Sequence, residues 1–161
     1  MFDGPSVAAA FRAAGITHVL WVPDSQLGRW DSALRSDPQL RLVRVCREGE
    51  AIAVAGGLLL GGARPIVLMQ CTGLFEAGDA LRNIVHDLRL PLFLVVDVRS
   101  WRAYTLGKTT DTCPLFTEPI MRAWQIPYVL FEPDRHTPAD LAEEYRRAWA
   151  ERRAGAVLLP E

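Results

Sequence analysis

The residue best placed for chemistry is a glutamate, Glu48, between a short apolar stretch at 40–46 and a run of small residues at 48–60. The first segment is typical of a strand and the second of a helix. Backbone N–H groups in the first turn of a helix stabilise a carboxylate, whereas the apolar residues that follow leave it poorly solvated. Glu48 is therefore a candidate for proton exchange, although acidic residues in first turns often serve only the helix dipole.

Other polar groups follow the other predicted strands. In an open parallel sheet the ligand-facing loops come directly after the strands. We therefore expect binding residues in four loops, at 23–26, 47–49, 70–74 and 99–102. Taken singly, these residues also have structural interpretations: Asp24 and Ser25 as helix caps, Thr72 and Gly73 as a turn, and the arginines as solvated charges.

The hydrophobic pattern alternates between helices and strands along the chain. It predicts helices at 3–14, 27–34, 48–60, 74–88, 115–124 and 138–151, and strands at 17–22, 40–46, 65–70, 92–98, 128–131 and 156–159. This alternation indicates an α/β fold in a single domain over 1–161, with one doubly wound, mostly parallel six-stranded sheet and helices on both faces. The remaining long stretch, 99–114, is predicted to be irregular and is a candidate lid.

Composition excludes several classes of protein. The chain has 161 residues, 23% of them charged, with a formal net charge of -1, so no basic face suggests nucleic acid as a partner. Cys46, Cys71 and Cys113 stand singly, which favours reduced thiols over disulfides or a zinc site. The start of the chain does not resemble a leader, and no apolar run has the length of a membrane span, so we expect a soluble, cytoplasmic protein.

The glycines do not form a nucleotide-binding loop. Gly56 and Gly57 fall inside a predicted helix, and Gly61 and Gly62 fall at its end, so neither pair is the strand-to-helix turn of a dinucleotide fold. We expect the first pair to permit close helix packing. The histidines are isolated in sequence and lie outside the four loops, and we expect no metal site in this chain; they are His18, His86 and His136.

Together the four loops resemble the pyrimidine-binding (Pyr) domain of thiamine diphosphate enzymes, specifically the alpha subunits of the sulfopyruvate and phosphonopyruvate decarboxylase group. The resemblance spans nearly the whole chain and rests on Val22-Pro23-Asp24-Ser25, Arg47-Glu48-Gly49-Glu50-Ala51, Met69-Gln70-Cys71-Thr72-Gly73-Leu74 and Val98-Arg99-Ser100. It implies that Glu48 hydrogen-bonds N1′ of the cofactor's aminopyrimidine and so activates the cofactor for attack on a 2-oxo acid. Glu50 is the weaker candidate, because the helix start places it on a different face.

The resemblance also assigns roles to the other loop residues. It implies cofactor contacts from Glu48, Gln70, Thr72, Gly73 and Leu74, and substrate contacts from Asp24, Ser25, Arg99, Arg102 and Lys108. Arginine, lysine and hydroxyl donors suit the anionic tail of phosphonopyruvate or sulfopyruvate.

A partner subunit is expected on the same basis. Enzymes of this type bind Mg²⁺ and diphosphate through a Gly-Asp-Gly motif followed later by an asparagine. Here Gly78-Asp79 is followed by Ala80, and the single asparagine is Asn83. The resemblance therefore implies that the diphosphate- and magnesium-binding domain lies on a separate beta-type subunit, in a hetero-oligomer, and that the chain alone is inactive.

Two departures from the group leave alternatives open. Cys71-Thr72 stands where an asparagine–serine pair is common, and Glu76 adds a carboxylate that would disfavour an anionic substrate. A different 2-oxo acid is therefore an alternative. A related carboligase subunit is a second alternative, because the same half-site could serve carbon–carbon bond formation. A non-catalytic module that binds a small molecule or a partner is a third, because folds of this type host many functions.

Overall fold

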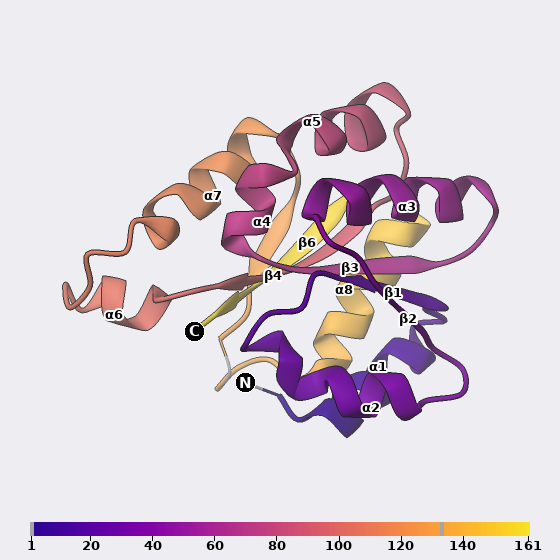
Figure 1. The fold of residues 1–161 in the computed structure, drawn as a ribbon, viewed down its shortest axis with the longest axis horizontal. Coiled ribbons are helices and arrows are strands. Elements are labelled where there is room, and N and C mark those ends of the chain that lie inside the picture. The colour runs from indigo at the N-terminus through magenta and orange to yellow at the C-terminus, as the bar shows by residue number, and fades with distance from the viewer. Residues whose placement is uncertain (1, 133) are drawn as a thin grey trace.

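The computed structural model describes residues 2–132 and 134–161, which form one all-parallel sheet of six strands between two layers of helices (Figure 1). The strands are β1 (His18–Trp21), β2 (Arg41–Arg44), β3 (Pro65–Gln70), β4 (Phe93–Val98), β5 (Tyr128–Leu130) and β6 (Gly155–Pro160), and their order across the sheet is β2-β1-β3-β4-β6-β5. The predicted α/β, doubly wound fold is confirmed.

Each face of the sheet carries its own helices and its own apolar core (Figure 1). One layer contains α1 (Gly4–Ala13), the 3-10 turn η1 (Leu27–Trp30), α2 (Asp31–Ser36) and α8 (Pro138–Ala150). The other contains α3 (Glu48–Leu60), α4 (Cys71–Glu76), α5 (Gly78–Leu81), the π-helical turn η2 (Arg82–Asp87) and α7 (Cys113–Ala123). The first core includes Phe11, Trp30 and Tyr145, and the second includes Ile52 and Met69.

The strand order creates a switch point between β1 and β3. From β1 the chain moves outward to β2, and it then returns to add β3 on the opposite side of β1. The loops that follow these two strands diverge at the carboxyl edge of the sheet, which is where open α/β sheets bind ligands. The predicted loops at 23–26 and 70–74 therefore flank the switch point.

Local signals account for the helices whose ends were predicted well. The Asp3 side chain accepts a hydrogen bond from the Ser6 N–H at 2.9 Å and caps α1, while Thr137 and Asp140 form a capping box at the start of α8. Helix α3 has the predicted bounds. It ends at Leu60 and is capped by Gly61, and the next residue, Gly62, has a φ of +78°, which favours glycine.

Three predictions of secondary structure need correction. The helix expected at 74–88 begins three residues earlier, at Cys71, and is broken into α4, α5 and η2, because Ala77 leaves the helical region and the Asn83 amide bonds the Asp79 carbonyl. The stretch 99–114 is not wholly irregular, because it contains α6 (Trp101–Thr105) and the start of α7. The strand expected at 40–46 is shorter, and its end residues Arg41 and Arg44 are exposed because β2 lies at the edge of the sheet.

The two glycines inside α3 differ in role. A Cβ atom at Gly56 would lie 2.5 Å from Cδ1 of Ile84, so the prediction of close packing is confirmed there. At Gly57 nothing lies within 4 Å of the same atom, and the prediction is wrong for that residue. Among the described residues, no helix combines the length and hydrophobicity that a bilayer crossing requires.

Candidate active site at the carboxyl edge of the sheet

Glu48 is the first residue of α3, and its side chain packs directly against Gly73 of α4. A Cβ atom at Gly73 would lie 2.3 Å from Cγ and 2.4 Å from Oε1 of Glu48, far inside van der Waals contact. The glycine has an ordinary helical backbone, so it is required here for space rather than for conformation. The two predicted residues, 25 positions apart in sequence, are therefore brought together.

The carboxylate of Glu48 is half-buried and has no hydrogen bond or ion pair to the part of the chain that the structure describes. Its two acidic neighbours are both engaged. Glu50 is exposed, and its Oε2 accepts the Cys46 N–H at 3.0 Å, so it caps the helix start as a structural residue. Of the three carboxylates, Glu48 alone is left to interact with a ligand.

Glu76 links the end of α4 to the start of α3. Its Oε2 accepts the Gly49 N–H at 2.9 Å, and its Oε1 accepts Nη2 and Nε of Arg47 at 2.6 and 3.0 Å. The bond from Gly49 first, and then Arg47, lower the pKa of Glu76. Arg47 therefore balances the charge of Glu76 at the start of α3. Sequence reasoning missed this pair, which joins residues 29 positions apart.

The remaining predicted cofactor residues lie at the junction of β3 and α4. Gln70 is the N-cap of α4, and the hydroxyl of the exposed Thr72 donates to its Oε1 at 3.2 Å. Both polar side chains are accessible at the edge. Leu74 is fully buried in the second core, so its side chain anchors the start of α4 to the core and is not available to a ligand.

The predicted substrate residues are not all gathered at one point. Asp24 has a structural role, because its carboxylate accepts the N–H groups of Gln26 and Leu27, each at 2.8 Å, and the indole N–H of Trp21 at 3.1 Å. The adjacent Ser25 is exposed at the same edge and remains available.

Three further substrate candidates lie on the segment that contains α6, which projects away from the sheet (Figure 1). Arg102 and Lys108 are exposed there. Arg99 is closer to the sheet, at the end of β4, and its Nε donates to Asp111 at 2.8 Å. The structure thus brings Arg99 to the carboxyl edge, and it also holds the backbone N–H of Arg102 there, through a 2.9 Å hydrogen bond to the carbonyl of Glu161 just after β6.

A buried acid at this edge was not identified from the sequence. Asp97 in β4 is 0% exposed, and neither carboxylate oxygen has a hydrogen-bond partner among the described residues. Burial, followed by the charges of Glu161 and Asp24, raises its pKa to about 7. Asp97 is in register with Gln70 on the neighbouring strand. The available sequence signal was an acidic residue inside an otherwise apolar strand.

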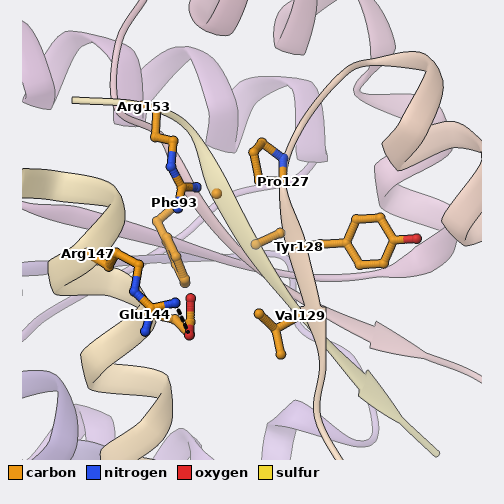
Figure 2. Close-up of a pocket in the computed structure, with 9 residues that line it drawn as sticks. Phe93, Pro127, Tyr128, Val129, Glu144, Arg147 and Arg153 are labelled. Carbon is orange, nitrogen blue, oxygen red and sulfur yellow. Dashed lines mark ion pairs between the residues drawn. The ribbon is translucent and has the colours of Figure 1, made fainter. Parts of the chain in front are cut away.

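A separate hollow of about 200 Å³ lies at the opposite, amino-terminal edge of the sheet (Figure 2). Its lining includes the first residues of β4, β5 and β6, and a 3.0 Å ion pair between Glu144 and Arg147 borders it. Arg153 also lines this hollow and pairs with Glu151. With its charges already paired and Glu48 at the other edge, this hollow is not the candidate active site. The described residues contain no group of three or more metal-ligating side chains.

The fold is one found in thiamine diphosphate-dependent decarboxylases. A 4-hydroxybenzoylformate decarboxylase of Rhodococcus jostii matches 99% of this chain with a TM-score of 0.70 and 20% identity, over 30% of its own length. The benzoylformate decarboxylase of Polynucleobacter necessarius matches the same share, also at a TM-score of 0.70, with 21% identity and over 30% of its length. No protein-family model matches the sequence.

Sequence comparison narrows the resemblance. The chain is 34% identical over 102 residues to phosphonopyruvate decarboxylase of Streptomyces viridochromogenes, which covers 63% of this chain and 25% of that protein. It is 28% identical over 125 residues to the sulfopyruvate decarboxylase subunit alpha of Methanococcus maripaludis, covering 76% of this chain and 73% of that subunit. The resemblance to the phosphonopyruvate and sulfopyruvate decarboxylase group is confirmed, and the chain spans about a quarter of the length of the phosphonopyruvate decarboxylases it matches.

The contact between Glu48 and Gly73 is testable by a double-mutant cycle. We expect Gly73→Ala to lower the free energy of unfolding by about 1–3 kcal/mol, because the new methyl group overlaps the glutamate side chain. In a Glu48→Ala background the same change should cost much less, since the obstructing atoms are gone. Urea denaturation of the four proteins measures the coupling; equal costs in both backgrounds would show that the two residues do not touch.

Asp97 should make the stability of the chain depend on pH. Its pKa is raised in the folded state, so the folded protein retains a proton that the unfolded chain releases, and stability falls as the pH rises from the ordinary aspartate value of 3.8 to about 7. We expect Asp97→Asn to be more stable than the parent by about 2–4 kcal/mol above pH ~7 and to lose this pH slope. Urea denaturation at a series of pH values tests this; parallel curves for the two proteins would contradict it.

Proposed function

We propose that this chain is the alpha, pyrimidine-binding subunit of a two-chain thiamine diphosphate-dependent decarboxylase that acts on an anionic 3-substituted pyruvate such as phosphonopyruvate or sulfopyruvate. The observation that carries the proposal is the free, half-buried carboxylate of Glu48, held against Gly73 beside the switch point of the sheet. Its position agrees with the group of enzymes to which the sequence is similar.

The residues at this edge fit an aminopyrimidine ring. Glu48 has an unoccupied carboxylate that can accept a hydrogen bond from a ring nitrogen and hold a proton there, and Gly73 leaves the space that this requires. Gln70 and Thr72 offer amide and hydroxyl groups next to it. When bound, thiamine diphosphate supplies an electron sink for the loss of carbon dioxide.

Neighbouring groups prepare Glu48 for this task. Glu76 fixes the first turn of α3 by holding Arg47 and Gly49, so the Glu48 backbone is positioned before any ligand arrives. Buried Ala51 and Ile52 follow three and four positions later, on the same face of the helix as Glu48. A half-buried acid that has no protein partner is well suited to gain and lose a proton during a catalytic cycle.

An anionic substrate agrees with the charges of the chain. The carboxylate of Glu76, which suggested otherwise, is balanced by Arg47. Ser25 and Arg99 at the carboxyl edge are our candidates for binding the anionic tail, because hydroxyl and guanidinium groups donate hydrogen bonds to such groups. Arg102 and Lys108 are exposed on the segment that contains α6, and we propose that their side chains approach the substrate when this segment closes over it.

We place the diphosphate- and Mg²⁺-binding domain on a beta-type partner subunit. Relatives that match over most of their length are named as alpha subunits, which supports a hetero-oligomer. The outer face of α3 is consistent with a partner: residues 51–60 carry no charge, and Val54 and Leu60 are 36% and 69% exposed. Exposed apolar side chains of this kind mark contact surfaces.

The catalytic role of Glu48 is tested with a matched pair of variants. In the assembled complex we expect Glu48→Gln to lower kcat by about 10²–10⁴-fold, because glutamine keeps the size of the side chain but cannot exchange the proton. Glu50→Gln, two residues further on, should retain activity, since glutamine can still accept the Cys46 N–H. Carbon dioxide release from 3-phosphonopyruvate, 3-sulfopyruvate and pyruvate is the measurement.

The same assay distinguishes the alternatives. Undiminished turnover in Glu48→Gln would exclude the proposed role of this carboxylate. Activity on pyruvate alone would preserve the decarboxylase assignment but overturn the anionic substrate. A complex that consumes the 2-oxo acid only when an aldehyde is added, and that forms a carbon–carbon bond, would be a carboligase.

A further inference from the structure

A second hollow at the amino-terminal edge of the sheet is lined by basic groups. It measures about 350 Å³, lies just after the ends of η2, α7 and α8, and shares Pro127 and Arg153 with the hollow of Figure 2. A volume of this size is within the range of small-molecule sites. No acidic residue of the described chain lines it, and its polar lining consists of His86, Arg89, Gln125, Arg152 and Arg153.

Two of these arginines are not balanced by an acid. Arg89 and Arg152 are exposed, and neither forms an ion pair with the part of the chain that the structure describes. The acids nearest to them in sequence already have arginine partners, in the pairs Asp87–Arg82 and Glu151–Arg153. The hollow therefore carries an excess of positive charge, which comes from Arg89 and Arg152.

The backbone around this hollow has a conformation that disfavours side chains. Arg89, Gln125 and Arg152 have φ values of +53°, +51° and +51°, and each lies two positions after the last residue of a helix. They are three of the four non-glycine residues with a positive φ in the described chain. Glycine is favoured at such positions, because a Cβ atom is crowded in the left-handed region. The sequence thus places long polar side chains where glycine would give more stability.

Stabilisation of the helix ends does not account for these three residues. The C-terminus of a helix attracts cations, but a basic side chain inside the last turn provides this without strain. Arg122 and Arg147 already occupy the last turns of α7 and α8, and His86 occupies that of η2. Gln125, moreover, carries no charge. Backbone strain that gathers at one hollow, on polar side chains, indicates a function for those side chains.

Hydrogen bonds hold the walls of the hollow in place before any ligand arrives. Nε2 of His86 donates to the carbonyl of Trp124 at 2.7 Å and so ties the end of η2 to the end of α7. The N–H of Arg153 donates to the carbonyl of Ala148 at 3.1 Å and fixes the turn that follows α8. The rest of the lining is apolar and consists of Val85, Leu90, Pro127 and Ala154.

We propose that this hollow binds a small organic phosphate, with its phosphate group on Arg89 and Arg152 and its organic part against the apolar lining. A phosphate monoester carries about 1.5–2 negative charges at neutral pH, so it matches this pair of arginines better than a single carboxylate does. Guanidinium groups also bind phosphate oxygens in a planar, bidentate geometry. The site lies at the opposite edge of the sheet from Glu48, and it does not depend on the proposed decarboxylase activity.

The site is tested by NMR titration of the ¹⁵N-labelled full chain with phenyl phosphate, inorganic phosphate and benzoate. We expect phenyl phosphate to shift the amide signals of residues 85–90, 125–126 and 152–154, which surround the hollow. Its affinity should exceed that of benzoate and of inorganic phosphate by about tenfold or more, because only phenyl phosphate offers both the charge and the apolar part. Unshifted signals at these residues, or equal affinity for benzoate, would overturn the proposal.

Replacement of the strained arginines separates binding from folding. We expect Arg89→Gly and Arg152→Gly each to lower the affinity for phenyl phosphate by about tenfold or more, because charge-assisted hydrogen bonds are lost. Each should also raise the thermal midpoint of the free chain by about 2–4 °C, because the left-handed strain is relieved. Arg35→Ala, which removes an exposed arginine of α2 outside the hollow, should leave the affinity unchanged.

The same variants can overturn the proposal. Glycine variants that lose stability and bind phenyl phosphate as the parent does would show that Arg89 and Arg152 only support the helix ends. An equal loss of affinity in Arg35→Ala would reduce the effect to the net charge of the chain. Phenyl phosphate should raise the thermal midpoint of the parent more than that of either glycine variant, and equal shifts in all three would place its binding elsewhere.

Discussion

Glu48 can occupy its position only because residue 73 has no side chain. Any Cβ atom there would lie 2.3 Å from Cγ of the glutamate, so the glutamate side chain would have to leave this position. The rest of the edge is organised around this contact. Strand β3 leads into α4 without a separate loop, so Gly73 lies in the first turn of the helix, and the strand order places that helix beside the switch point.

The charges around Glu48 are arranged so that it alone remains free. Glu50 accepts a hydrogen bond from the backbone N–H of Cys46, and Glu76 accepts hydrogen bonds from Arg47 and Gly49. Each of these bonds stabilises the start of α3 while leaving the central carboxylate without a partner in the described chain. An unpaired, half-buried carboxylate contributes little to the free energy of folding, and burying it without a partner costs free energy. A ligand that hydrogen-bonds to this carboxylate would offset that cost. The buried Asp97 beneath the same edge likewise has no hydrogen-bond partner among the described residues.

Much of the architecture was predictable because it depends on local patterns. The apolar runs of β3 and β4, the bounds of α3 and the caps of α1 and α8 follow from periodicity and from particular residues such as Asp3 and Thr137. The breaks after α4 were not predictable, because they depend on the local backbone at Ala77 and on how Asn83 bonds back to Asp79. The exposure of β2 depends on its place at the edge of the sheet, which a single strand sequence does not reveal.

The candidate site, like the fold, has parts that the sequence predicted and parts that it did not. The four loops and Glu48 were predictable, since strand ends meet at one edge and the motifs occur in a recognisable order. The sequence did not reveal which loop residues already have partners: Asp24 accepts the N–H groups of its own turn, and Glu76 pairs across 29 positions with Arg47. These are tertiary contacts between residues whose individual sequence signals are weak. They also determine which groups are left for a ligand.

The central claim is that Glu48 forms one half of a site completed by another subunit. The most direct measurement is native mass spectrometry of the complex purified through a tag on this chain from its own cells. The account predicts a hetero-oligomer that contains a second subunit together with thiamine diphosphate and Mg²⁺. Recovery of this chain alone, or of an oligomer of identical copies without the cofactor, would contradict it and would favour a binding module that uses the same fold.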